Sequence, residues 1–265
     1  NKKINYSIDN KIYDVIFTDN ILAQLNLKFS KIKSDKKIYL IYDENINNQI
    51  ISELSKGLKI TGSIVLKKKI KSQKKNKNIN VVIKLIEELN NNKFTKKSVI
   101  VACGGGVVGD LCGLVGSLYL RGMIFINIPT TMTAIVDSCI GGKTAVNHKN
   151  IINLIGSYYH PEVVFIYYKL LKTLPIREYL AGLSEIIKCG LISKNGVIKN
   201  LKKNKSKFFN RDKKFLSEIV LKTLKTKSSF FEKDIYEKNK RLFLNFGHTF
   251  AHAIEMATDK LSSKD

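Results

Sequence analysis

Short runs of β-branched and aliphatic residues alternate with helix-like segments in the first two thirds of the chain. Buried strands are predicted at residues 37–42, 98–103 and 123–128, where apolar side chains follow one another without a polar face. Between them, residues 81–89 and 110–120 carry apolar side chains at helical spacing. Alternation of this kind predicts an open, mostly parallel α/β sheet.

The pattern changes near residue 172. Beyond it no strand-like run remains, and a proline stands where a helix would begin. We therefore expect an α/β domain over residues 1–172 and an all-α domain over residues 173–265. Amphipathic helices of the second domain are predicted at residues 176–191, 214–231 and 250–257.

The composition is that of a basic globular protein. The 46 Lys and Arg exceed the 22 Asp and Glu, which gives a formal charge of +24, while 44% of the residues are apolar. That apolar share excludes a mainly disordered basic tail. The charge is carried almost wholly by Lys, and the densest cluster, between Lys67 and Lys77, contains no aromatic residue on which a base would stack. We therefore attribute the charge to compositional drift and expect no nucleic-acid partner.

The same survey predicts a cytoplasmic protein without a membrane anchor. No apolar run approaches the roughly 20 residues that span a bilayer, and the first ten residues lack the apolar core of a signal peptide. Cys103, Cys112, Cys139 and Cys189 lie in apolar segments with no Cys-x-x-Cys pair. Buried, reduced thiols are therefore expected rather than disulfides or a cysteine zinc site.

A glycine-rich turn follows the strand at residues 98–103. Gly104 to Asp110 satisfy G-x-G-x-x-G between a strand and a helix, the setting in which glycine lets helix N-terminal amides approach a pyrophosphate. Asp43, at the end of the strand at residues 37–42, is placed to hold a ribose hydroxyl. The turn predicts a Rossmann-like dinucleotide site, with a tight turn that merely needs small residues as the alternative.

A second glycine-flanked loop presents a carboxylate and an ammonium six residues apart. These are Asp137 and Lys143, in the run VDSCIGGKT. A P-loop is excluded because Asp137 stands where its first glycine belongs. The loop suits a polar, phosphorylated small molecule, although as an isolated pair the two charges are more simply explained as a surface ion pair.

Two imidazoles, His248 and His252, are spaced i and i+4, which puts them on one face of a predicted helix. This spacing suits two metal ligands, or one ligand and one acid/base group. A third ligand is available from Glu185, with Lys188 beside it at i+3, or from Glu255 on the same face as the histidines. The residues alone leave that choice open.

Seven segments together resemble one family. The segments are GGGVVGDLCG (104–113), YLRG (119–122), PTT (129–131), VDSCIGGKTAVNH (136–148), TLPIRE (173–178), GLSEIIK (182–188) and LNFGHTFAHAIE (244–255). In order and spacing they resemble 3-dehydroquinate synthase over almost the whole chain. The resemblance implies an NAD-binding α/β domain, a helical domain that binds Zn²⁺ or Co²⁺, and a homodimer. It also implies a lyase of the shikimate pathway that converts the sugar phosphate 3-deoxy-D-arabino-heptulosonate 7-phosphate into 3-dehydroquinate and phosphate.

The resemblance also assigns residues to roles. It implies Glu185 and His248 as metal ligands, and Arg121 as the arginine that reaches into a neighbouring subunit's site. The positions that match substrate and phosphate contacts are Asp137, Lys143, Asn153, Lys188, Lys227, Arg241, Asn245 and His252. The positions that match NAD contacts are Asp43, Lys75, Gly105, Gly106, Val107, Val108, Gly109, Asp110, Thr130, Thr131, Lys143, Thr173, Leu174 and Glu178.

Three departures from the family pattern stand out. Ile152 replaces a lysine expected to contact NAD or substrate, and Lys149 is the nearby ammonium expected to substitute for it. Ser72 replaces an acidic residue before Gln73. The remaining zinc-ligand histidine of the family has no counterpart at residues 259–265, which leads us to expect a chain truncated at its C-terminus.

Two other functions remain open. One is a related sugar-phosphate cyclase of the same fold, although Asn245 and His252 together favour dehydroquinate synthesis. The other is a degenerate, non-catalytic basic binding protein, which the charge of +24 and the loss at Ile152 support.

Overall fold

The computed structural model describes residues 2–8, 11–60, 62–149 and 151–262, and the chain forms two compact units. The first unit comprises residues 1–183 and the second residues 184–265. The division therefore falls inside helix α6 (Ile176–Leu191), whereas the loss of strand signals placed a boundary just before that helix. Because α6 continues across the division, the hydrophobic pattern of the sequence does not change there and could not predict it.

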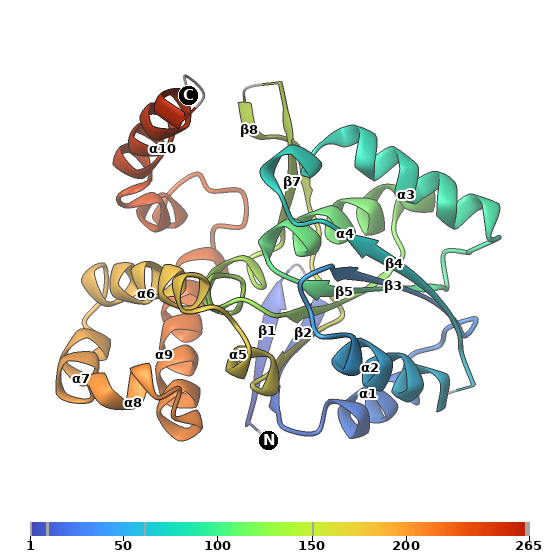
Figure 1. The fold of residues 1–265 in the computed structure, drawn as a ribbon, viewed down its shortest axis with the longest axis horizontal. Coiled ribbons are helices and arrows are strands. Elements are labelled where there is room, and N and C mark those ends of the chain that lie inside the picture. Colours follow the sequence, from blue (N-terminus) through green and yellow to red (C-terminus); the bar gives the residue numbers. More distant parts are fainter. Residues whose placement is uncertain (1, 9–10, 61, 150, 263–265) are drawn as a thin grey trace. The chain divides into compact units, whose positions relative to one another are not determined.

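A seven-stranded sheet organises the first unit (Figure 1). Its order is β1-β2-β9-β6-β5-β3-β4, and every neighbouring pair is parallel except the hairpin of β1 and β2. The expected mostly parallel α/β fold is confirmed. The strands are β1 (Lys2–Ile8), β2 (Lys11–Thr18), β3 (Lys37–Asp43), β4 (Ile64–Ile70), β5 (Val99–Gly104), β6 (Ile124–Pro129) and β9 (Val163–Tyr167).

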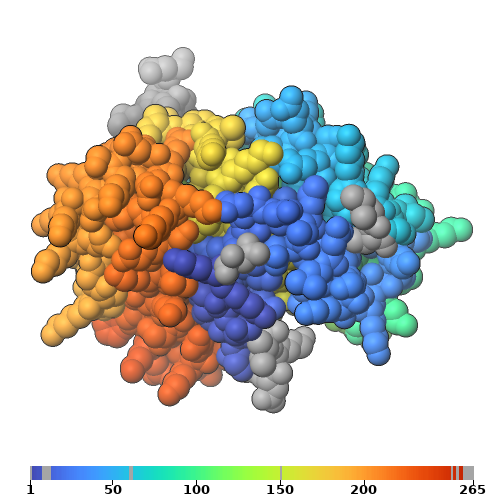
Figure 2. Space-filling model, turned by 90° about the horizontal axis from the view of Figure 1, so that it is seen from below, coloured from blue at the N-terminus to red at the C-terminus, as the bar shows by residue number. Residues whose placement is uncertain are grey.

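Helices cover both faces of this sheet, as Figure 1 shows. Alternate strand residues point to opposite faces, so Leu40 and Val101 pack with helices α1 (Ile21–Phe29) and α2 (Asn48–Ile60). Tyr39 contributes instead to the opposite core. That core includes helices α3 (Ile79–Asn91) and α4 (Gly106–Leu118). Figure 2 shows the surface that the blue N-terminal segments form on the α1 side.

Three of the continuously apolar strands were predicted, whereas the equally buried β9 and the more polar strands were not. All six residues of β5 are buried, so no alternation is needed, and the expected strands at β3, β5 and β6 are confirmed. Strand β4 lies at the sheet edge and reads Ile-Val-Leu-Lys-Lys-Lys-Ile, with largely solvated side chains. Lysines on such an edge oppose pairing with another chain. The hairpin of β7 (Lys143–His148) and β8 (Ile151–Tyr158) was missed for the same reason, because β8 is mostly exposed.

Helix α4 differs from its predicted bounds at both ends. It begins at Gly106, directly after β5, and ends at Leu118 rather than at residue 120. Leu120 and Arg121 have φ values of +48° and +64°, which no α-helix accommodates. The chain therefore leaves the helix through the short 3₁₀ turn η2 (Tyr119–Arg121).

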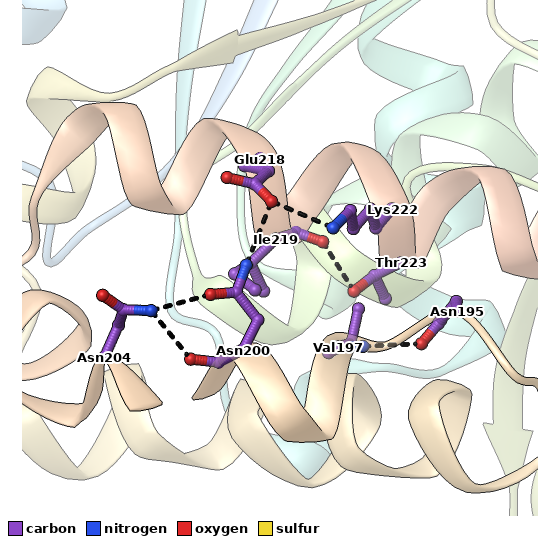
Figure 3. Close-up of polar contacts among 8 residues, drawn as sticks. All are labelled: Asn195, Val197, Asn200, Asn204, Glu218, Ile219, Lys222 and Thr223. Carbon is purple, nitrogen blue, oxygen red and sulfur yellow. Dashed lines mark hydrogen bonds and ion pairs between the residues drawn. The ribbon is translucent and has the colours of Figure 1, made fainter. Parts of the chain in front are cut away.

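The second unit is helical throughout its described part. It contains the end of α6, α7 (Val197–Lys203), α8 (Lys205–Phe209), α9 (Lys213–Phe231), the 3₁₀ segment η4 (Lys240–Asn245) and α10 (His248–Ser262). Side-chain hydrogen bonds join α7 to α9: Asn200 donates to Glu218 at 3.0 Å, and Lys222 pairs with the same carboxylate at 2.9 Å (Figure 3). Asp212 caps α9 by accepting from the backbone N–H of Phe215.

All four cysteines are buried thiols that form no disulfide, as expected. Burial raises the pKa of the Cys103 thiol to about 12, with a smaller contribution from the Asp43 carboxylate. This thiol is therefore protonated and unreactive at neutral pH. Of the helices that the structure describes, none has the length and hydrophobicity of a membrane-spanning segment.

Asp35 ties the start of β3 to the loop before β5. Its carboxylate accepts hydrogen bonds from Thr95 Oγ1 at 2.6 Å, Ser98 Oγ at 2.7 Å and the backbone N–H of Lys37 at 3.0 Å. Partial desolvation alone would raise the pKa of Asp35, but these hydrogen bonds outweigh it and lower the pKa below its ordinary value.

We therefore predict that Asp35→Ala lowers the free energy of unfolding by about 1 kcal/mol at pH 7, because the three donors lose their acceptor at a solvated site. A depressed folded-state pKa stabilises above the unfolded value and is lost as pH falls through the folded value. The difference between wild type and variant should accordingly shrink below about pH 4. Denaturant titrations at both pH values measure it, and a difference that is constant with pH would contradict this account.

Candidate active site

The carboxyl ends of the parallel strands bring several predicted residues to one edge of the sheet. Asp43 is the last residue of β3, the glycine turn follows β5, and Thr130 follows β6. The backbone N–H of Thr130 donates to Gly104 O at 2.9 Å, so the turn and the two threonines lie side by side. Ligands of open α/β sheets bind at this edge.

The glycine turn leaves an uncapped helix N-terminus. Gly105 is the N-cap of α4 and, lacking a side chain, makes no capping hydrogen bond. A Cβ on Gly105 would stand 3.1 Å from Thr131 Cγ2, so a larger residue would crowd the space in front of the helix. Backbone N–H groups that no side chain satisfies, at the positive end of a helix dipole, form an anion site. The turn thus fits a pyrophosphate.

Asp43 is 8% exposed, and its Oδ1 accepts from the backbone N–H and the side-chain amide of Asn45 at 2.9 and 3.0 Å. These bonds hold the carboxylate at the carboxyl end of β3, the edge at which an acidic residue binds a ribose hydroxyl in dinucleotide folds. Lys75 lies in the 3₁₀ turn η1 (Lys74–Asn76) after β4 and is exposed.

Residues of the second glycine loop line a small cavity with the start of α4. Asp137 lies in the π-helical segment η3 (Ala134–Ser138), a geometry often found at functional sites. Lys143 begins β7 and lines the cavity together with Asp110 and Ser138. The structure therefore brings the end of this loop to the helix that follows the glycine turn.

An ion pair connects three elements beside this cavity. Lys77 Nζ lies 2.6 Å from Asp110 Oδ2 on α4 and 2.5 Å from Asn153 Oδ1 on β8. Sequence reasoning missed Lys77 and named Lys149 as the nearby ammonium, and the role expected of Lys149 stays a prediction. Lys77 is remote in sequence from Ile152, and a run of surface lysines surrounds it, so only the folded chain shows its position.

The remaining predicted residues of the first unit lie apart from this cluster in the chain. Arg121 is exposed on η2. Thr173 and Leu174 lie between α5 (Lys169–Lys172) and α6, and Glu178 is exposed in the first turn of α6.

The second unit contains three buried cations on three elements. Lys188 on α6, Lys227 on α9 and Arg241 on η4 are 8%, 7% and 2% exposed. Lys188 pairs with Glu185 one turn earlier. Burying cationic groups costs free energy unless anions or acceptors compensate them. As buried cations of the described residues, Lys188, Lys227 and Arg241 are candidate contacts for an anionic ligand.

Arg241 is oriented by its own loop. Its Nη1 donates to Ile235 O at 2.6 Å, and its guanidinium lies 5.5 Å from the ring centroid of Phe231. Asp234 accepts from the backbone N–H of Arg241 and of two preceding residues. Desolvation tends to raise the pKa of Asp234, but these hydrogen bonds and the nearby guanidinium lower it below its ordinary value.

The candidate metal ligands occupy α6 and the start of α10. Glu185 is half-buried, and His248 is the first residue of α10, with its Nδ1 shielded from solvent. A carboxylate and an imidazole suit Zn²⁺. Within the described residues, no three acidic, histidine or cysteine side chains gather as a metal site. The side chains of His252 and Glu255 lie outside the described part, and Asn245 donates to Glu237 Oε1 at 2.8 Å.

Comparison with known proteins identifies the family to which the chain belongs. Residues 67–181 match the family model described as 3-dehydroquinate synthase N-terminal, and residues 182–262 match 3-dehydroquinate synthase C-terminal. A 3-dehydroquinate synthase of Prochlorococcus marinus is 37% identical over 96% of this chain and 71% of that protein. The chain belongs to the 3-dehydroquinate synthase family. It is therefore related to enzymes, as the sequence resemblance predicted.

Another relative and two solved structures are similar to this chain in sequence or in fold. A 3-dehydroquinate synthase of Dictyoglomus thermophilum is 49% identical over 68% of this chain, and the match spans about half, 51%, of that protein. A 2-deoxy-scyllo-inosose synthase complexed with carbaglucose-6-phosphate, NAD⁺ and Co²⁺ is 26% identical, with a TM-score of 0.83 over 97% of this chain and 69% of that one. ValA, a 2-epi-5-epi-valiolone synthase from Streptomyces hygroscopicus, is 24% identical with a TM-score of 0.84 over 93% and 68%, and shares the fold.

Close packing of α4 against the β7–β8 hairpin positions the cavity in this family member. A Cβ on Gly113 would stand 2.3 Å from Thr144 Cγ2, and Thr144 Oγ1 donates to Ser157 O at 3.0 Å. The absent side chain at Gly113 lets β7 lie directly on the helix.

We predict that Gly113→Ala lowers the free energy of unfolding by about 1–3 kcal/mol, because the added methyl group displaces Thr144 and its hydrogen bond. Gly109→Ala is the matched control on the same helix, since its Cβ would meet nothing closer than 3.6 Å. Thermal and denaturant unfolding compare the two variants. Equal stability of both would show that the hairpin does not depend on this contact.

Proposed function

We propose that the protein is a 3-dehydroquinate synthase, a carbon–oxygen lyase that converts 3-deoxy-D-arabino-heptulosonate 7-phosphate into 3-dehydroquinate and phosphate. The observation that carries the proposal is the open N-terminus of α4, flanked by Asp43 and Thr130 at the carboxyl edge of the sheet. Many anions could bind at this edge. Family membership favours a dinucleotide among them.

In this proposal the α/β unit binds NAD. Backbone N–H groups from Gly105 to Val108 would contact the pyrophosphate, with Gly109 completing the turn, and Asp43 would accept from the adenosine ribose. Thr130, Thr131 and Lys75 complete the edge, and Thr173, Leu174 and Glu178 are the further NAD contacts that the family resemblance implies. NAD⁺ held there would supply a reversible hydride acceptor.

Glu185 and His248 are the ligands that this chain would give to a divalent metal. A carboxylate and an imidazole form part of a catalytic zinc or cobalt site, which needs at least one further ligand. Such an ion supplies positive charge that acidifies a coordinated substrate hydroxyl. Lys188 restrains Glu185 through their ion pair, which keeps the carboxylate rotamer fixed.

The buried cations orient the substrate. Lys188, Lys227 and Arg241 provide charge for a phosphate and a carboxylate, and their burial strengthens each interaction because water screens it less. Loss of inorganic phosphate leaves negative charge on the departing group, which fixed cations stabilise. Asn245 and His252 are the further polar groups proposed in the second unit, and Asp137, Lys143 and Asn153 are those proposed in the first.

The assembly that we propose is a cytoplasmic homodimer. Exposed Arg121, held at φ +64° on η2, projects from the protomer surface and is proposed to complete the site of a neighbouring subunit.

A second candidate is a related sugar-phosphate cyclase, which the likeness to 2-deoxy-scyllo-inosose synthase supports. The two candidates differ in the substrate carboxylate, which a hexose phosphate lacks. Phosphate release is therefore measured with the heptulosonate phosphate and with glucose 6-phosphate, each with NAD⁺ and Zn²⁺. Release from the heptulosonate phosphate supports our proposal, whereas release only from the hexose phosphate supports the second candidate.

The metal assignment predicts that Glu185→Ala and His248→Ala each lower phosphate release at least about 100-fold, because each removes a ligand and its orienting contacts. Glu255→Ala is the matched carboxylate control and should keep zinc content near that of wild type. Metal analysis of the purified variants accompanies the rate assay. Loss of zinc in Glu255→Ala with retention in Glu185→Ala would instead indicate a site built on α10 alone.

A further inference from the structure

Backbone pairing brings the segment after β4 to the β7–β8 hairpin. The N–H of Asn147 donates to Lys77 O at 2.8 Å, and Asn78 forms an isolated parallel bridge with Asn147. Asn78 also caps α3, where its Oδ1 accepts from the backbone N–H of Val81. The position of Lys77 is therefore fixed by a helix start on one side and by the hairpin on the other.

The Lys77 side chain then joins two further elements. Its Nζ reaches Asp110 on α4 and Asn153 on β8, at 2.6 and 2.5 Å. The Lys77 and Asp110 side chains are 14% and 16% exposed. At that exposure the pair is screened less than a surface salt bridge, and its hydrogen bonds are charge-assisted.

Asn153 is held on its backbone side as well. Its N–H donates to Asn147 Oδ1 at 3.0 Å, and its φ is +54°, a conformation that asparagine tolerates better than most residues. Lys77, Asn147 and Asn153 thus form a closed set of hydrogen bonds across the hairpin.

The ammonium determines which way the Asn153 amide faces. A lysine ammonium only donates hydrogen bonds, so the atom that faces Lys77 is the amide oxygen. The amide nitrogen, with its two donors, then lies on the other side of the group. An amide in this orientation offers N–H groups to an acceptor such as a phosphate or carboxylate oxygen.

We propose that Lys77 is a positioning residue that orients the Asn153 amide for an anionic substrate and fixes the β7–β8 hairpin to α4. The substrate part rests on the proposed function, in which Asn153 and Lys143 of this hairpin contact the sugar phosphate. Asp110 balances the charge of Lys77, which keeps the ammonium at the hairpin rather than in solvent.

The test compares Lys77→Met with Lys71→Met, an exposed lysine of the same connection that undergoes the same change of charge and shape. Hydrogen–deuterium exchange is followed in peptides that cover β8. Loss of the charge-assisted hydrogen bonds should raise exchange there about 10-fold in Lys77→Met, with no change in Lys71→Met. Lys77→Arg, which keeps the donors and the charge, should restore most of the protection.

Steady-state kinetics test the orientation of the amide. Lys77→Met should raise KM for the heptulosonate phosphate about 10-fold with a smaller effect on kcat. Asn153→Asp keeps an acceptor for Lys77 but exchanges the amide donors for a second oxygen. It should therefore raise KM while β8 stays protected, a combination that a purely structural role of Lys77 does not produce.

The outcomes separate the two proposals. Equal β8 exchange in Lys77→Met and Lys71→Met overturns the positioning role, whatever the activity. If β8 exchanges faster in Lys77→Met but the wild-type protein releases no phosphate, the hairpin contact of Lys77 is retained and the proposed function is overturned. Should Lys77→Met fail to fold, Asn153→Gly removes the same contact from its other end at a backbone angle that suits glycine, and unchanged exchange there overturns the proposal.

Discussion

Parallel pairing of β5 with β3 and β6 is the constraint on which the candidate cofactor site depends. β5 is buried along its whole length, and its neighbours continue to the same edge, where Tyr42 pairs with Cys103 and Gly104 with Pro129. Because parallel strands end together, one register places the carboxylate of Asp43, the glycine turn and the threonines after β6 side by side. A shift in that register would separate all three.

The register itself is enforced by burial on both faces. Residues of β5 contribute alternately to the core with α1 and α2 and to the core with α3 and α4. A slip by one residue would exchange the two sets of side chains, so neither core would pack. Apolar packing outside the candidate cofactor site thus positions the carboxyl edge of the sheet. The turn after β5 therefore need not contribute stabilising side chains and can consist of glycine.

Sequence reasoning succeeded where one local pattern determined the outcome. Uniformly apolar runs gave β3, β5 and β6, and helical spacing gave α6 with its observed bounds. It failed for β8 and β4, whose side chains are largely solvated, since a strand stabilised by backbone pairing need not be apolar. It also missed β9, although that strand is apolar throughout. It also failed for Lys77, because a contact between residues remote in sequence leaves no periodic signal.

The same distinction applies to charge. The excess of +24 is spread over surface lysines and, as composition, indicates no specific partner. Lys188, Lys227 and Arg241 differ from the surface lysines because folding removes them from water. The desolvation cost of each must be compensated by other interactions. A diffuse positive surface attracts a phosphorylated anion from a distance, and this attraction weakens with salt. In the proposed function, the buried cations would bind such an anion at short range, where screening is weak, so recognition would depend on these few residues rather than on net charge.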